Sequence, residues 1–175
     1  MAALAIIFAA ILLASCKTPK AESFDVSALP DMVMEQASYT LGRGDGDSVV
    51  LAAEEIRIYS RDQKRSELDK VSFTATDKAT GETTVTGTCD LAIVADGNSS
   101  ATLSGNVVFQ SIRDNVTVTC DSLDWDSDSG LITCDGTVNV SYGDGTRIQA
   151  RGLTAVPDKD IYEFAEIMEG IHESD

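Results

Sequence analysis

The sequence predicts an all-β fold, and three observations support this prediction. From about residue 39 onward, apolar residues alternate with polar ones at a spacing of two, which is typical of half-buried antiparallel strands. Clusters of Gly, Asp, Asn and Ser interrupt the alternation about once every dozen residues, as turns between strands do. Units of about 30 residues also repeat along the chain. With 175 residues and 43% apolar composition, the chain is long enough to form one domain with a core.

The alternating segments give the expected strands in order. The clearest cover residues 48–60, 70–77, 101–111 and 146–152. Thr, Val and Ile are abundant in them, and these residue types favour strands. Residues 161–171 are expected to form a final strand with a shift in phase, and a helical turn is the alternative there.

An internal repeat organises these strands into pairs. The residues Thr-Cys-Asp at 88–90 recur at 119–121, and the same offset of 31 carries Gly-Asn-Val at 105–107 onto Gly-Thr-Val at 136–138. A weaker third copy runs from residue 148 to residue 167. Each unit contains two strands joined by a polar turn, and such a unit cannot bury its apolar face alone. Neighbouring units are therefore expected to stack into a sandwich or jelly roll.

The N-terminal residues predict an export signal. Residues 4–14 are an unbroken apolar run of 11, which is too short to cross a bilayer because a spanning helix needs roughly 20 residues. The run ends in Leu-Ala-Ser-Cys at 13–16, which resembles the lipobox of bacterial lipoproteins. The resemblance implies that Cys16 is acylated and becomes the first residue of the mature protein, tethered to a membrane. The alternative is an ordinary signal peptide followed by a chance cysteine.

These segments define the expected domain organisation. Residues 17–28 contain Pro, Ser and mixed charges without periodicity, which indicates a flexible tether. We expect a lipoprotein signal peptide at 1–15, the lipidated cysteine and tether at 16–36, the β-jelly roll at 37–171 and a C-terminal tail at 172–175.

The charge balance and the residue types exclude several classes of function. The 29 acidic and 13 basic residues give a net charge of −16, which repels phosphate backbones and predicts that the protein does not bind nucleic acid. The one histidine, His172, lies at the C-terminal end, so the usual general base and metal ligand is missing elsewhere. The chain contains no Gly-x-Ser-x-Gly motif and no glycine-rich phosphate loop. We therefore expect a protein that is not an enzyme and that holds neither a metal nor a cofactor.

Three cysteines remain after Cys16, namely Cys89, Cys120 and Cys134. Each is in phase with apolar neighbours at a spacing of two, which favours small buried hydrophobic residues on strand faces. An odd number of cysteines cannot be fully paired. A Cys120–Cys134 disulfide is the alternative for two of them, because the periplasm is oxidising.

The stretch at 124–130, Asp-Trp-Asp-Ser-Asp-Ser-Gly, has the carboxylates of a calcium loop. An EF-hand loop, however, needs glycine at position six and glutamate at position twelve. Counted from Asp124, those positions hold Ser129 and Asp135. The corresponding places in the neighbouring repeat units hold turn-forming residues without a shared ligand set. A solvated hairpin turn is therefore the preferred interpretation.

Three segments together resemble one protein family. Residues 30–60, with an Asp-Gly turn before a strand that ends in Ala, acidic and aliphatic residues, are similar to the start of the LptC family. Residues 101–111 resemble the Leu-x-Gly-x-Val strand of that family and of its relatives LptA and LptD, and residues 117–158 resemble its next segment. The order and spacing of the motifs carry the resemblance, which covers roughly residues 30 to 170.

The resemblance implies a fold and a function. The fold is a twisted, V-shaped open β-jelly roll of antiparallel strands, whose apolar groove holds acyl chains. The function is that of a periplasmic component of lipopolysaccharide export, which accepts lipopolysaccharide or a similar amphiphile from the jelly rolls of an ABC transporter permease. It passes the amphiphile to an LptA-like bridge protein by edge-to-edge docking, and the inner membrane is favoured as its location. A structural or adhesive β-repeat lipoprotein that binds no lipid is the alternative.

The candidates for the inner face of the groove are aliphatic and aromatic residues of the expected strands, and plain core packing is the competing role for each. They are Ile56, Ile58, Phe73, Leu91, Ile93, Leu103, Val107, Phe109, Val116, Val118, Ile132, Val138 and Val140.

Overall fold

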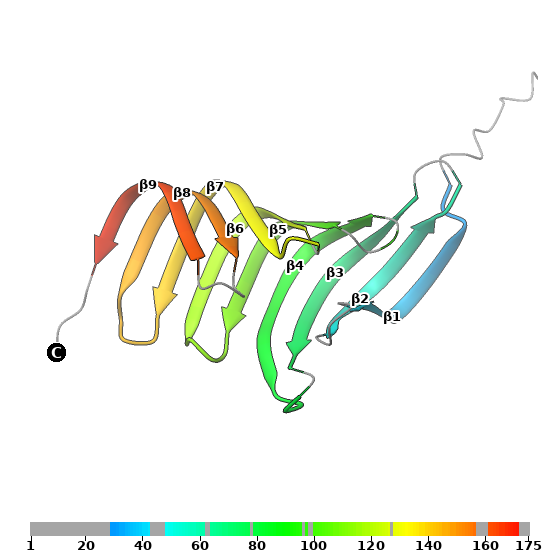
Figure 1. Ribbon diagram of the computed structural model, residues 1–175. Coiled ribbons are helices and arrows are strands. Elements are labelled where there is room, and N and C mark those ends of the chain that lie inside the picture. The colour runs from blue at the N-terminus through cyan, green and yellow to red at the C-terminus, as the bar shows by residue number, and fades with distance from the viewer. Residues whose placement is uncertain are drawn as a thin grey trace, which may run out of the picture.

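The computed structural model describes residues 29–42, 48–61, 64–77, 79–95, 97, 100–126, 128–156 and 161–171. These residues form one antiparallel sheet of nine strands, in which each strand pairs with its neighbours in sequence (Figure 1). The strands are β1 (Met32–Gly42), β2 (Ser48–Tyr59), β3 (Arg65–Thr76), β4 (Thr83–Ala95), β5 (Ser100–Ser111), β6 (Val116–Asp126), β7 (Leu131–Tyr142), β8 (Arg147–Val156) and β9 (Ile161–Ile171). The predicted all-β fold, an open jelly roll, is confirmed.

The first and last strands refine the sequence-based boundaries. β1 begins at Met32, so residues 32–36, which the sequence placed in the tether, are already strand. They pair with β2, where Met34 lies opposite Ile56 and packs against the core. At the other end, residues 161–171 form β9, so the expectation of a final strand is confirmed and the helical alternative is wrong. The expected signal peptide, Cys16, the tether up to residue 28 and the tail at 172–175 lie outside the described residues.

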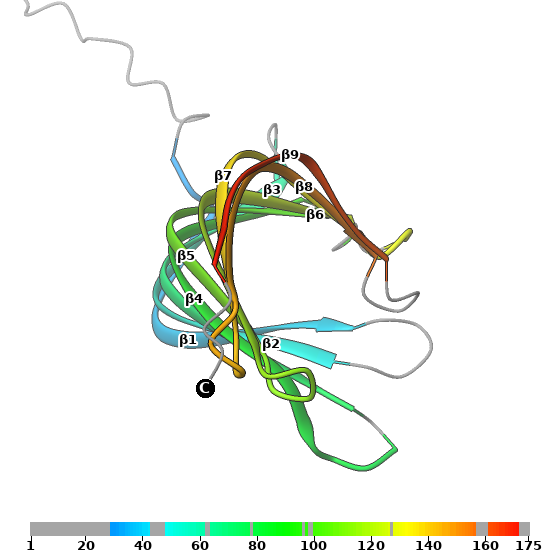
Figure 2. The same cartoon turned by 90° about the vertical axis from the view of Figure 1, so that its left-hand side faces the viewer.

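Each strand from β1 to β8 bends near its middle, where the pairing with its neighbours is interrupted. Figure 2 shows that the bent strands curl around a space that is open along one side. We call this row of interruptions the fold line. It contains Gln36, Glu54, Lys70, Asp90, Gly105, Asn106, Asp121, Asp135, Gly136 and Gly152. Between β4 and β8 the register also shifts at these interruptions. Such β-bulges bend a strand and increase its twist, so the sheet has two arms that face each other.

The fold line also changes which residues face inward. On β4 the buried residues are Cys89, Ala92 and Val94, so a spacing of two becomes three across the bend. This shift keeps the apolar residues of both arms inside the V. The core contains Leu51, Ala53, Ile56, Leu68, Val71, Phe73, Cys89, Ala92, Val94, Ala101, Leu103, Val107, Cys120, Leu123, Cys134, Val138, Val140, Leu153 and Ala155.

The internal repeat of the sequence marks the fold line. In both copies of Thr-Cys-Asp the cysteine is buried and the aspartate lies at the bend. In both copies of Gly-x-Val the glycine lies at the bend and the valine is buried, with Val107 1% and Val138 0% exposed. The repeat therefore encodes the bend of each strand pair as well as the pairing itself.

Polar contacts stabilise the outer side of the fold line. The Lys70 ammonium donates a hydrogen bond to Asp90 over 2.6 Å, and the Asn106 amide donates one to the other oxygen of Asp90 over 2.7 Å. These two contacts hold the pKa of Asp90 below its ordinary value. Gly105 has a φ of +74°, and an added Cβ would lie 2.8 Å from the Asp90 Cβ. Glycine at this bend is thus required both by the backbone and by the close approach of β4.

Candidate functional site

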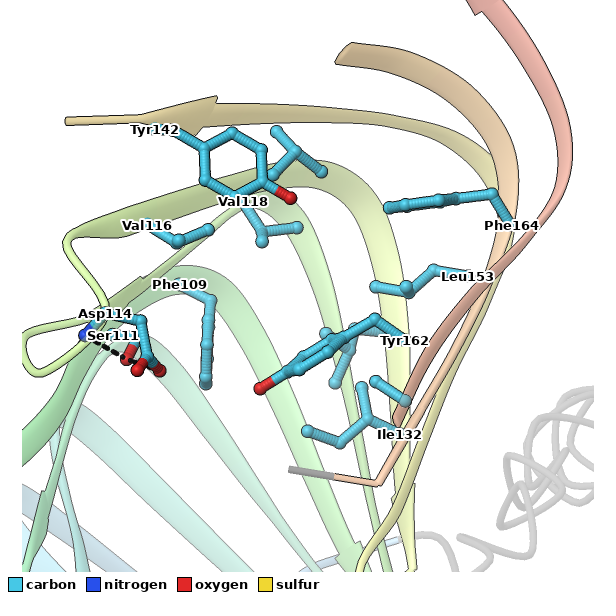
Figure 3. Close-up of a pocket in the computed structure, with 13 residues that line it drawn as sticks. Phe109, Ser111, Asp114, Val116, Val118, Ile132, Tyr142, Leu153, Tyr162 and Phe164 are labelled. Carbon is cyan, nitrogen blue, oxygen red and sulfur yellow. Dashed lines mark hydrogen bonds between the residues drawn. The ribbon is translucent and has the colours of Figure 1, made fainter. Parts of the chain in front are cut away.

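A cavity of about 230 Å³ lies inside the C-terminal half of the sheet. Figure 3 shows Phe109 on one side of it and Leu153, Tyr162 and Phe164 on the other, all pointing into the same space. The lining consists of Phe109, Ser111, Asp114, Val116, Val118, Leu123, Ile132, Val140, Tyr142, Leu153, Ala155, Tyr162 and Phe164. Most of these side chains are aliphatic or aromatic, so the cavity suits an apolar ligand.

The polar groups of the lining are few. Ser111 and Asp114 belong to the end of β5 and the turn after it, and the Ser111 hydroxyl donates a hydrogen bond to the Asp114 carboxylate over 2.7 Å. Tyr142 and Tyr162 are 37% and 52% exposed, so their rings lie between the apolar interior and water. A tyrosine in this position presents an apolar ring and a polar hydroxyl to an amphiphilic ligand.

The structure brings together most of the residues that the sequence proposed for the groove. Phe109, Val116, Val118, Ile132 and Val140 line the cavity. The others that face inward are either buried in the core or packed against it, and they are Ile56, Ile58, Phe73, Leu103, Val107 and Val138.

Leu91 and Ile93 are different, because the structure places them on the outer face of β4. Ile93 lies opposite Glu67 on β3 and Thr102 on β5, and directly opposed residues of a sheet point to the same side. The sequence assigned both to the inner face by counting in twos from Cys89. The bulge at the fold line shifts the phase, so Ala92 and Val94 are the inward residues.

The sequence did not propose several residues of the lining. Leu153 and Ala155 follow the bend of β8 at Gly152, where the alternation changes phase. Tyr162 and Phe164 stand on β9, which the sequence predicted as a strand without assigning any of its residues to the groove. Their period-two spacing within each arm was the available signal, and the position of the bend was the missing information.

The acidic stretch at 124–130 forms the end of β6 and the turn into β7, as the turn interpretation predicted. The Asp126 carboxylate accepts hydrogen bonds from the Ser129 backbone N–H over 2.8 Å and from its hydroxyl over 2.6 Å. These contacts hold the pKa of Asp126 below its ordinary value. Asp124 accepts a hydrogen bond from Thr102 on β5. Among the described residues, no group of three or more His, Cys, Asp or Glu side chains is arranged to hold a metal ion.

The three cysteines of the described chain are free thiols and are buried, as small hydrophobic residues would be. Burial raises the pKa of Cys89 to about 11. Burial and the neighbouring Cys134 raise the pKa of Cys120 to about 12.

Within the described residues, β1 and β9 each pair with one neighbour only, and both carry exposed apolar side chains. On β1, Met32 and Val33 are both more than half exposed. The exposed large apolar residues of β9 are Ile161, Tyr162, Ile167, Met168 and Ile171, of which Ile167 is 65% exposed. An exposed strand of this length with apolar side chains is a template for a strand of another protein.

Comparison with known proteins gives one clear result. No curated protein matches the chain, and in the part of the chain that the structure describes no helix is long and apolar enough to cross a membrane. A family model described as lipopolysaccharide-assembly, LptC-related, matches residues 1–173. The match includes the apolar cavity, the fold line and both edge strands. The chain therefore belongs to the LptC family.

Proposed function

We propose that this protein accepts an acyl chain of lipopolysaccharide in the cavity between β5 and β9 and passes the amphiphile along its open groove. Membership of the LptC family implies a role in lipopolysaccharide export, in the periplasm and in association with the inner membrane. The observation that supports the finer proposal is the cavity itself, whose lining is apolar apart from a few groups.

The size of the cavity supports part of an acyl chain as its occupant. Pockets that enclose a drug-sized ligand measure roughly 300–1,000 Å³, and this cavity is smaller at about 230 Å³. Burial of methylene groups contributes about 0.8 kcal/mol each, so a short stretch of chain is enough for reversible binding. Weak binding suits a carrier, because the ligand must leave as readily as it enters.

The two edges of the sheet supply two docking surfaces. β1 follows the proposed tether in sequence. Its edge would therefore lie at the membrane-proximal end and pair with the jelly rolls of an ABC transporter permease. β9 lies at the opposite end of the sheet (Figure 1) and would pair with an LptA-like bridge protein. Pairing at both ends would join the grooves of successive proteins into one path. An ATPase elsewhere would supply the energy, since no chemical step is assigned to this chain.

A lipid anchor would hold the domain at the membrane. We propose that the signal peptide at 1–15 is removed, that Cys16 is acylated and that the residues up to β1 act as a tether. Incorporation of labelled palmitate into the wild-type protein and its loss from Cys16→Ser would support this anchor. Equal incorporation into both proteins would contradict it.

Photo-crosslinking in cells tests the proposed function. A photoreactive residue at Phe109 or Val118 should crosslink to lipopolysaccharide, because both side chains line the cavity. The matched control is Val108, which lies next to Phe109 on β5 but opposite Thr88 and Thr119, on the outer face. Crosslinks at Phe109 and Val118 without a crosslink at Val108 support the proposal. No crosslink at any cavity position would favour a structural or adhesive β-lipoprotein.

A further inference from the structure

The polar side chains of the cavity lie along its rim. Ser111 and Tyr142 are the last residues of β5 and β7, Asp114 belongs to the turn after β5, and Tyr162 stands at the start of β9. Leu123, by contrast, is close to the fold line on β6. The cavity is therefore apolar in its depth, near the fold line, and polar at the rim, where the strands end.

The rim carries a carboxylate and no cation of its own. None of the described residues that line the cavity is Lys, Arg or His, and Asp114 is the one charged residue among them. Its side chain is 44% exposed, so the carboxylate lies between the cavity and water. One of its oxygens accepts the hydrogen bond from the Ser111 hydroxyl (Figure 3). A carboxylate can accept about four hydrogen bonds, so it can bind further donors.

The neighbouring Arg113 does not turn the rim into a site for anions. Its Nε lies 3.4 Å from the Asp114 carboxylate, its side chain is 73% exposed, and it does not belong to the lining. An ion pair this exposed contributes little. Residues 114–171 contain 12 acidic and 3 basic residues, so the field around the C-terminal half of the sheet is negative. A phosphate at the rim would therefore meet net repulsion.

We propose that the headgroup held at this rim is uncharged and rich in hydroxyl groups, such as a sugar without phosphate. The inference rests on the proposed function, which places the acyl chain of the same amphiphile in the apolar depth of the cavity. Hydroxyl groups of the ligand donate hydrogen bonds to Asp114 and exchange them with Ser111. Tyr142 and Tyr162 add an apolar ring and a polar hydroxyl each.

Charge repulsion gives the rim its selectivity. A phosphate would bring a second negative charge next to the Asp114 carboxylate, at a place that is partly shielded from water. Among amphiphiles with the same acyl chain, the cavity therefore selects the one with the less negative headgroup.

A matched pair of probes tests this selectivity. Monolauroylglycerol and monolauroylglycerol phosphate share one acyl chain, which carries a photoreactive diazirine in both, and differ in the phosphate alone. Each is added to the purified full chain in phosphatidylcholine nanodiscs with EDTA, because a divalent cation would bridge phosphate and carboxylate. Intact mass spectrometry measures the crosslinked fraction. The wild type should crosslink the neutral probe roughly fivefold more, since like charges about 4 Å apart repel each other by that factor even in water.

Two variants separate the rim from the net charge of the protein. Asp114→Asn should raise crosslinking of the phosphate probe roughly fivefold, because the repelling charge is gone. Asp121→Asn is the matched control, since it removes the same charge from an exposed residue of the fold line outside the cavity, and it should keep the wild-type ratio.

Three results would contradict the inference. The first is an equal ratio of the two probes in Asp114→Asn and Asp121→Asn. The second is stronger crosslinking of the phosphate probe by the wild type, and its loss in Arg113→Gln would assign the rim to phosphate. The third is a crosslink to neither probe, which would refute the proposed function itself, so the two failures are distinguishable.

Discussion

Gly87 on β4 shows how a single missing side chain shapes the inner face. It lies between Phe73 on β3 and Phe109 on β5 in the same row of the sheet. The two rings meet over it with their centroids 6.4 Å apart. A Cβ at Gly87 would lie 2.1 Å from the Phe73 ring and 2.3 Å from the Val108 carbonyl oxygen. The row therefore requires glycine at its centre.

We expect Gly87→Ala to lower the free energy of unfolding by about 1–3 kcal/mol, because the ring or the backbone must move. Gly136→Ala is the control, since an added Cβ there meets nothing within 4 Å. Its effect should be below about 0.5 kcal/mol. Urea unfolding of both variants measures the difference, and equal effects would show that the aromatic row tolerates the methyl group.

A substitution at Phe109 can test lipid binding without unfolding the protein. It is partly exposed and lines the cavity, whereas its neighbour Val107 is 1% exposed and belongs to the core, where a charge would unfold the protein. We expect Phe109→Asp to reduce the lipopolysaccharide crosslink of a photoreactive residue at Val118 by roughly tenfold or more, because a carboxylate in an apolar cavity repels an acyl chain. Val108→Asp on the outer face should leave the crosslink unchanged. Equal crosslinking in both variants would argue against the cavity as the binding site.

At the scale of elements, β9 is the strand most exposed to a partner. Deletion of residues 161–171 should abolish binding of the bridge protein, because the docking edge is removed. Phe164 packs against the core, so the deletion also disturbs folding. A milder variant, Ile167→Asp, changes a side chain that is 65% exposed and should weaken the same binding without lowering the Tm. Pull-down of the bridge protein measures both, and retained binding by the deletion variant would refute the assignment of this edge.

The turn between β6 and β7 depends on one carboxylate. The Asp126 carboxylate accepts hydrogen bonds from Ser129, and these hydrogen bonds lower the pKa of Asp126. A lowered pKa stabilises the folded protein above the ordinary aspartate value of 3.8, and the contribution disappears as the pH falls through the folded value. Asp126→Ala should therefore lower the Tm at pH 7 but not at strongly acidic pH. Asp128→Ala, an exposed position of the same turn, is the control.

The same variants test the metal interpretation of this turn. Calcium should leave the Tm of the wild type and of Asp126→Ala unchanged, because the Asp126 carboxylate already accepts two hydrogen bonds. A calcium-dependent rise of the wild-type Tm that Asp126→Ala lacks would show that the turn binds the ion.

At the scale of the whole molecule, the net charge of −16 opposes the compact state. Ion pairs on the outer face, such as that of Arg57 with Asp69 at 2.5 Å, offset only a small part of this repulsion. Raising the NaCl concentration from about 0.01 M to about 0.15 M shortens the screening length from about 30 Å to about 8 Å, so it should raise the Tm. Sucrose of matched osmolality controls for solute effects. A Tm that falls with salt would mean that the ion pairs dominate.

The sequence was sufficient to predict the elements because their signals are local. Alternation at a spacing of two located the strands, and the 31-residue repeat showed that they form pairs. The same alternation correctly predicted that eleven of the thirteen proposed groove residues face inward, because it holds within each arm of a strand. The predicted inward orientation of Leu91 and Ile93 was wrong, because the bulge between the two arms of β4 is hardly visible in the hydrophobic pattern.

The amino-acid sequence by itself determined the fold class, the turns, the acidic surface and the family resemblance, all of which depend on residue types and their spacing. Only the tertiary structure decided which apolar residues enclose a cavity and which merely pack. The reason is geometric: the positions of the bends set the phase of every strand, and the bends arise where neighbouring strands interrupt their pairing along one line.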